Sequence, residues 1–141
     1  MNRSQILTDV LLDKRAWHAS TIDDATSWYY LLSTKCLFAF DTFIQNLRCH
    51  PQPITEIRIQ KSLFDICTEC LQPVVDTLNM GQGFAIVERI PVEQYTLEES
   101  QIIYWLIGQF LGHPLAQDIK GTLLYDVKNT GQSVTQTLAF Q

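Results

Sequence analysis

The sequence lacks any long hydrophobic run and has few cysteines. No apolar stretch approaches the ~20 residues of a membrane-spanning helix. The first five residues, MNRSQ, hold one basic residue and lead into no hydrophobic core of a signal peptide. Four cysteines in 141 residues fall below the density of a disulfide-stabilised scaffold, so reduced thiols are the simpler expectation. These absences predict a cytoplasmic protein with no membrane partner.

Positive charge is also scarce. The chain has 10 Lys and Arg against 15 Asp and Glu, a formal net charge of -5, and the basic residues are scattered. Nucleic-acid binding requires clustered Lys and Arg, so the composition argues against a nucleic-acid partner. The apolar fraction of 46% is too high for a disordered chain, and 141 residues are enough for one compact domain with its own core.

Hydrophobic periodicity predicts a helical region over residues 1–80. The longest pattern runs through residues 25–47, where apolar side chains recur every three or four positions after a possible N-cap at Thr21. A second apolar face follows Ser62, and Pro73 lies inside it. Since proline removes a helical hydrogen bond, we expect a kink or a break there.

Residues 81–141 have a different pattern, which predicts strands around one helix. The short apolar run at residues 84–87 is typical of a buried strand, and residues 123–127 suggest another. Between them, Thr96 and Glu99 have the spacing of a capping box and precede a strongly apolar helix. Helices followed by this strand–helix–strand pattern indicate the α+β class.

The sequence contains no catalytic constellation that residue types and spacing alone identify. Cys67 and Cys70 form a CxxC, but on the apolar face of a predicted helix, where packing as small hydrophobic side chains explains them better than zinc or redox chemistry. His18, His50 and His113 make no HxH, HxD or HExxH pattern. We therefore assign no catalytic, cofactor-binding or metal-binding residue to the chain.

Five short motifs nevertheless resemble, in order, those of the TauD/TfdA family of Fe(II)/2-oxoglutarate-dependent oxygenases. The resemblance covers about residues 81–131, and Arg89-Ile90 and Asn129 depart from the family's RG and from the Asp of its DTG. The matching pairs are GFAIVERIPV (83–92) with GFxxxRGxPV, YTLEE (95–99) with YSxEE, YWLIGQFLG (104–112) with YWxLGxxLG, HPLAQ (113–117) with xPxxQ, and KGTLLYDVKNTG (120–131) with KGxLLxxVxDTG.

This resemblance implies a fold, a chemistry and an incomplete site. The family's double-stranded β-helix, or jelly roll, would begin within residues 81–141, after the helices of residues 1–80. The family's metal ligands, an HxD and a distal His, and the Arg that binds 2-oxoglutarate would all follow the end of this chain. The resemblance places only Gln117, Gly121 and Leu124 near the family's cavity.

Three interpretations remain open from the sequence. The chain is the N-terminal part of an iron/2-oxoglutarate dioxygenase, completed by further sequence or by a second polypeptide that supplies the Fe(II) and 2-oxoglutarate sites for a small-molecule substrate. Alternatively, it is a non-catalytic accessory protein derived from that family, acting as a homo-oligomer or with a partner chain, or an unrelated small-ligand-binding α+β module. The first two predict exposed strand edges and exposure of Phe84, Ile86, Leu124 and Phe140.

Overall fold

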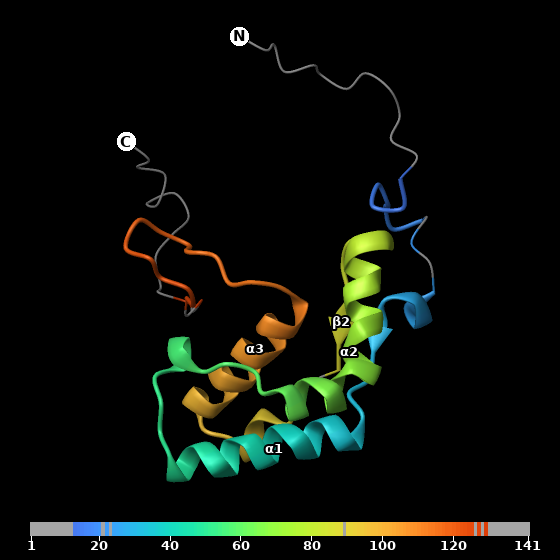
Figure 1. Ribbon diagram of the computed structural model, residues 1–141. Helices are drawn as coiled ribbons and strands as arrows, with labels where there is room; N and C mark the ends of the chain where they lie inside the picture. Colours follow the sequence, from blue (N-terminus) through green and yellow to red (C-terminus); the bar gives the residue numbers. More distant parts are fainter. Residues whose placement is uncertain are drawn as a thin grey trace.

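The computed structural model describes residues 13–20, 22, 24–88, 90–125, 127 and 129, and its core is helical (Figure 1). A 3-10 turn at Ala25–Ser27 and a two-residue strand, β1, precede the first helix, and further 3-10 turns precede α2 and α3. The elements are β1 (Tyr29–Tyr30), α1 (Thr34–Cys49), a 3-10 turn (Ile54–Glu56), α2 (Lys61–Met80), β2 (Ile86–Val87), a 3-10 turn (Val92–Gln94) and α3 (Leu97–Leu111).

The three helices meet in one cluster of buried apolar side chains. Helix α2 contacts both α1 and α3, so it lies at the centre of the packing. The side chains that close the cluster are fully buried, and they come from all three helices and from the connection before α2: Phe40, Ile44, Ile57, Leu71, Ile103 and Leu106. Burying a side chain of this size contributes about 1.5–3 kcal/mol of transfer free energy, so this cluster is the main source of stability.

The expected helix over residues 25–47 is only partly present. Helix α1 begins at Thr34, where the Ser33 side chain accepts a hydrogen bond from the amide of Cys36 at 3.2 Å. Upstream, the chain instead forms the 3-10 turn and β1. The apolar periodicity did not mark this boundary, because it included Leu32, which packs on the core from a loop, and Tyr29, which lies in β1 and is 43% exposed.

Helix α2 keeps its proline inside a continuous helix. It begins one residue before the expected cap and runs to Met80 with Pro73 in its interior. No break occurs, and the ribbon of α2 bends along its length in Figure 1, as a proline inside a helix causes. Among the residues that the structure describes, no helix is long and apolar enough to cross a membrane.

A disulfide between α1 and α2 corrects the expectation of reduced thiols. Cys36 and Cys67 are both fully buried, their Cα atoms are 5.1 Å apart, and their sulfur atoms are bonded. Cys49 and Cys70 are free. The composition could not show the bond because a low cysteine density says nothing about which two cysteines face each other across a helix pair.

The connection between α1 and α2 is held to α3 by side-chain hydrogen bonds. The buried carbonyl of Ile57 accepts from the Trp105 indole and from the Gln109 amide, both at 3.0 Å. The side-chain carbonyl oxygen of Gln109 in turn accepts a hydrogen bond from the backbone amide of Ile59 at 3.2 Å. These bonds satisfy backbone groups that no regular ladder satisfies, and they fix the orientation of α3.

The strand predictions are confirmed only in part. β1 and β2 form a parallel pair, but β2 has two residues, and its Ile86 is 46% exposed rather than buried. Phe84 and Leu124 are half-buried, while Phe140 lies outside the described residues. Residues 123–125 form no strand in the structure. A jelly-roll portion therefore stays a prediction.

Helix α3 forms with the predicted cap. The Thr96 side chain accepts from the amide of Glu99 at 3.2 Å, and the Glu99 carboxylate accepts from the amide of Thr96 at 2.8 Å. The helix ends at Leu111, before Gly112. The capping box is thus confirmed, and it sets the start of the helix that carries the candidate site.

Candidate functional site

An open groove lies between α3 and the segment of residues 112–125. It has a volume of about 770 Å³, which falls within the range of small-molecule sites. Its lining is mainly apolar and includes Tyr104, Trp105, Gly108, Leu115, Leu123 and Leu124. A groove of this size and character suits the apolar part of a small ligand.

The side of the groove formed by α3 is open at a glycine. Gly108 lies in the middle of α3, and a Cβ atom added there would meet no heavy atom within 4 Å. One turn earlier, the Tyr104 side chain is 63% exposed. Glycine costs a helix interior about 1 kcal/mol relative to alanine, so Gly108 leaves space in the groove at the expense of helix stability.

A tight turn shapes the opposite side of the groove. The amide of Gln117 donates to the carbonyl of Thr122 at 2.7 Å, and the amide of Gly121 donates to the carbonyl of Asp118 at 3.1 Å. Gly121 has φ = +80°, which L side chains adopt only with strain. Since the turn needs this conformation, Gly121 has a structural reason to be glycine.

The Asp118 carboxylate holds that turn together. It accepts hydrogen bonds from the amides of Lys120 and Thr122 and from the Thr122 hydroxyl, each at 2.9 Å, and from the Tyr125 hydroxyl at 2.5 Å. These bonds, that from Tyr125 foremost, lower the pKa of Asp118 to about 2 and raise the pKa of Tyr125. The Asp118 carboxylate is therefore ionised at neutral pH and can accept all four hydrogen bonds.

The structure places two of the three predicted cavity residues at the groove. Gln117 and Leu124 line it, whereas Gly121 lies in the turn and is not part of the lining. The Gln117 side-chain amide donates to the carbonyl of Leu115 at 2.9 Å, so its orientation is fixed. His113, to which the sequence pattern assigns no ligand role, also lines the groove. Its position directly after the helix-ending glycine was the available signal.

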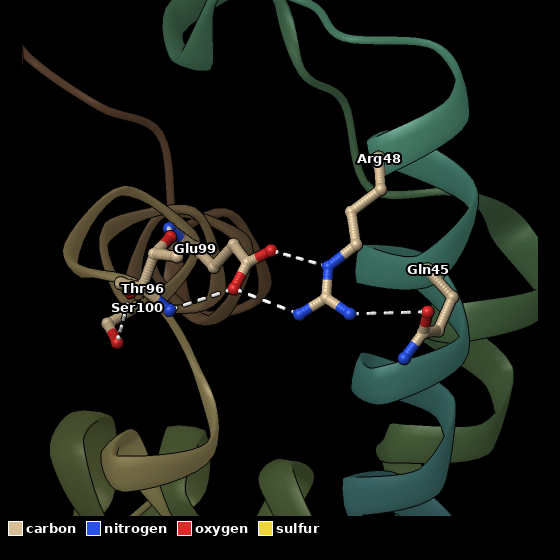
Figure 2. A network of polar contacts seen from close by, with 5 residues as sticks. All are labelled: Gln45, Arg48, Thr96, Glu99 and Ser100. Carbon is tan, nitrogen blue, oxygen red and sulfur yellow. Dashed lines mark hydrogen bonds and ion pairs between the residues drawn. The ribbon is translucent and has the colours of Figure 1, made fainter.

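A second, smaller cleft of about 270 Å³ lies between α1 and the start of α3. Figure 2 shows its polar centre: the Arg48 guanidinium donates to both carboxylate oxygens of Glu99, at 2.7 and 3.2 Å, and to Gln45 at 3.3 Å. The hydrogen bonds from Arg48, and after them the bond from the Thr96 amide, lower the pKa of Glu99 to about 2. Because Glu99 also caps α3, this ion pair joins the cap to α1, a link that the local capping pattern could not reveal.

The described residues do not fit an iron site. No group of three or more His, Cys, Asp or Glu side chains within them could hold a metal ion. The histidine of the groove, His113, has no such companions. No step of any reaction can therefore be assigned to a metal held by this part of the chain.

Comparison with known proteins gives one match to a longer enzyme. No protein-family model matches the chain. The chain is 20% identical over 128 residues to FR-33289 synthase of Streptomyces rubellomurinus (strain ATCC 31215), and the match covers 91% of this chain but 38% of the synthase. The chain thus spans about two fifths of that relative's length. Since only a tenth of the chain is left out, the similarity includes both the helical residues before 81 and most of the later motifs.

Proposed function

We propose that the chain is the N-terminal part, or one subunit, of an Fe(II)/2-oxoglutarate-dependent dioxygenase of the TauD/TfdA type. The observation that carries the proposal is the match to a synthase, which spans nearly all of this chain and about two fifths of the enzyme. The resemblance of the five ordered motifs of residues 81–131 to the TauD/TfdA family supports the choice of that oxygenase family. The exposure of Ile86 on a two-residue strand also supports a fold that further polypeptide completes.

In this proposal the groove of this chain forms one side of the substrate pocket, and iron and 2-oxoglutarate bind to residues beyond the described part. The apolar side chains of Tyr104 and Leu124 would contact the substrate and exclude water. The side-chain amide nitrogen of Gln117 donates a hydrogen bond to the Leu115 carbonyl, and this bond orients the side-chain carbonyl oxygen. That oxygen would accept a hydrogen bond from the substrate. The chain then positions a small molecule, while the oxidation itself belongs to the completed enzyme.

A second candidate function is the binding of a small ligand without catalysis. The observation in its favour is the groove itself, since its volume of about 770 Å³ and its apolar lining need no metal to bind a ligand. An accessory subunit derived from the oxygenase family would have the same groove. The two functions differ in whether the native assembly contains iron and consumes 2-oxoglutarate.

The first experiment is to purify the protein from its own source through a tag and to measure native mass, iron content and 2-oxoglutarate consumption together. The dioxygenase proposal predicts a mass well above 16.2 kDa, bound iron, and succinate formed from 2-oxoglutarate. An iron-free monomer of 16.2 kDa, or an iron-free homo-oligomer, would refute it and leave the binding or accessory function.

The groove can be tested separately by filling it at Gly108. A leucine there extends into open space, and leucine is a better helix former than glycine, so Gly108→Leu should fold at least as well as the parent. We expect Gly108→Leu to abolish substrate-dependent succinate formation while Gly108→Ala retains it. Equal activities of the two variants would remove the groove from the proposed site.

A further inference from the structure

The two-stranded sheet leaves one edge of β2 unpaired. The amides of Ile86 and Glu88 donate to the carbonyls of Trp28 and Tyr30, at 2.8 and 2.7 Å. Backbone groups alternate in direction along a strand, so the amide and carbonyl of Val87 point to the opposite edge. No hydrogen bond to the Val87 backbone occurs within the part of the chain that the structure describes.

The same sheet has one partly exposed apolar face. Tyr29 and Ile86 are direct cross-strand partners and are 43% and 46% exposed, and Leu31, which follows β1, is 63% exposed. The other register pair, Tyr30 with Val87, packs on the helical core. Among the residues that the structure describes, the helices thus cover one face of the sheet, and the side chains of Tyr29, Leu31 and Ile86 on the other face are 43–63% exposed.

These two features are complementary to an added strand. A free edge offers backbone donors and acceptors that only an extended chain can satisfy in register. A two-stranded sheet is marginal by itself and is stabilised by packing against a helix or by further strands. Here the helical core packs on one face, and an added strand would extend the sheet at its free edge. Small ligands do not match a row of backbone groups beside an apolar face, so the expected occupant is a polypeptide strand.

We propose that the free edge of β2 pairs with an extended strand of the polypeptide that completes the oxygenase, and that apolar residues of that polypeptide cover Tyr29, Leu31 and Ile86. This inference rests on the proposed function. It selects the completing polypeptide over a second copy of this chain because the relative has about three fifths of its length outside the match. We call the Val87 edge together with these three side chains the sheet-edge surface.

Amide hydrogen exchange at single-residue resolution tests the surface in the native assembly, isolated as above. The amides of Ile86 and Glu88 are internal references because β1 already holds them. The proposal predicts that the Val87 amide exchanges as slowly as these two. If Val87 exchanges freely while Ile86 and Glu88 are protected, no strand covers the edge and the proposal is overturned.

A matched pair of variants tests whether the edge contributes to assembly. Val87→Pro removes the outward amide and keeps both ladder bonds from Ile86 and Glu88, and the extended conformation of Ile86 tolerates a following proline. Val87→Ala trims the side chain and retains the amide. We expect Val87→Pro to weaken association with the completing polypeptide on the order of tenfold and Val87→Ala to leave it nearly unchanged.

The outcomes also separate this inference from the proposed function. An assembly that contains iron and consumes 2-oxoglutarate but tolerates Val87→Pro keeps the dioxygenase and refutes the sheet-edge surface. An assembly made only of copies of this chain, joined through a protected Val87, refutes the occupant. If completion occurs within one longer polypeptide, the same two variants are compared by the protection of Ile86 and Glu88, which Val87→Pro should reduce and Val87→Ala should not.

Discussion

The disulfide between α1 and α2 should be a major contribution to the stability of the helical core. Cys36 and Cys67 are separated by 31 residues, and closing a loop of that length lowers the entropy of the unfolded chain by an amount equivalent to about 3.7 kcal/mol at 25 °C. Both cysteines are fully buried, so the bond joins α1 and α2 within the core. We therefore expect reduction to lower the free energy of unfolding by about 3–4 kcal/mol.

Urea unfolding of the protein with and without a thiol reductant measures this loss. With a urea dependence of about 2 kcal/mol per molar, the midpoint should fall by about 2 M after unfolding, reduction and refolding. The variant Cys49→Ala/Cys70→Ala lacks the free thiols and should show the same fall. The variant Cys36→Ala/Cys67→Ala should not respond to reductant.

Two results would refute the reasoning about the disulfide. The first is a count of four reactive thiols in protein unfolded without reductant, since the bond leaves two. The second is an unchanged urea midpoint after complete reduction. That result would mean that the unfolded chain already holds α1 and α2 together, so that the cross-link removes little entropy.

Three further predictions concern single positions, each measured by urea unfolding. Thr96→Ala removes the cap of α3 and should cost about 1 kcal/mol, while Thr96→Ser should be nearly neutral. Gly121→Ala places a side chain at φ = +80° and should cost about 1 kcal/mol although there is room for it; an unchanged midpoint would exclude strain in the turn. The pKa of Glu99 is about 2 in the folded protein, below the ordinary 4.5. The ionised Glu99 carboxylate therefore contributes fully to the free energy of unfolding above pH 4.5, and this contribution is lost as the pH falls toward 2. Because Arg48 is 46% exposed, the free energy of unfolding of the parent should exceed that of Glu99→Gln by only about 1 kcal/mol at pH 7. If the ion pair is responsible, the two free energies of unfolding should become equal near pH 2.

Local sequence patterns predicted the start of α3 and the interior of α2. The start of α1 depends on tertiary contacts, and the sequence pattern predicted it wrongly. The capping box of Thr96 and Glu99 works because both partners lie within one helical turn. Apolar periodicity extended the first helix too far, because Tyr29, Leu32 and Cys36 have helical spacing although Tyr29 lies in β1 and Leu32 in a loop. Burial alone does not distinguish the two conformations.

The prediction of cavity residues stays a prediction, because the structure does not test whether this groove is the family's cavity. Gln117 and Leu124 were placed near a cavity by resemblance, and both line the groove. The groove also depends on the Asp118 turn, which brings Tyr125 back toward the segment after α3. Hydrogen bonds from two amides and two hydroxyls to one carboxylate have no periodic signature, so the sequence could not show that Asp118 organises this side of the groove.

In the described part of the chain, the contacts that stabilise the helical core are distinct from the sheet edge that we propose for assembly. The helices are joined by a buried disulfide, by an ion pair between α1 and α3, and by side-chain hydrogen bonds to the carbonyl of Ile57. The apolar side chains between them are buried. The sheet, by contrast, has two residues per strand and a free edge. A variant that unfolds the helical core should therefore abolish assembly and activity together, whereas Val87→Pro should weaken assembly on the order of tenfold with little change in the urea midpoint. If instead Val87→Pro lowers the midpoint as much as reduction of the disulfide does, the sheet belongs to the stabilising core and the separation fails.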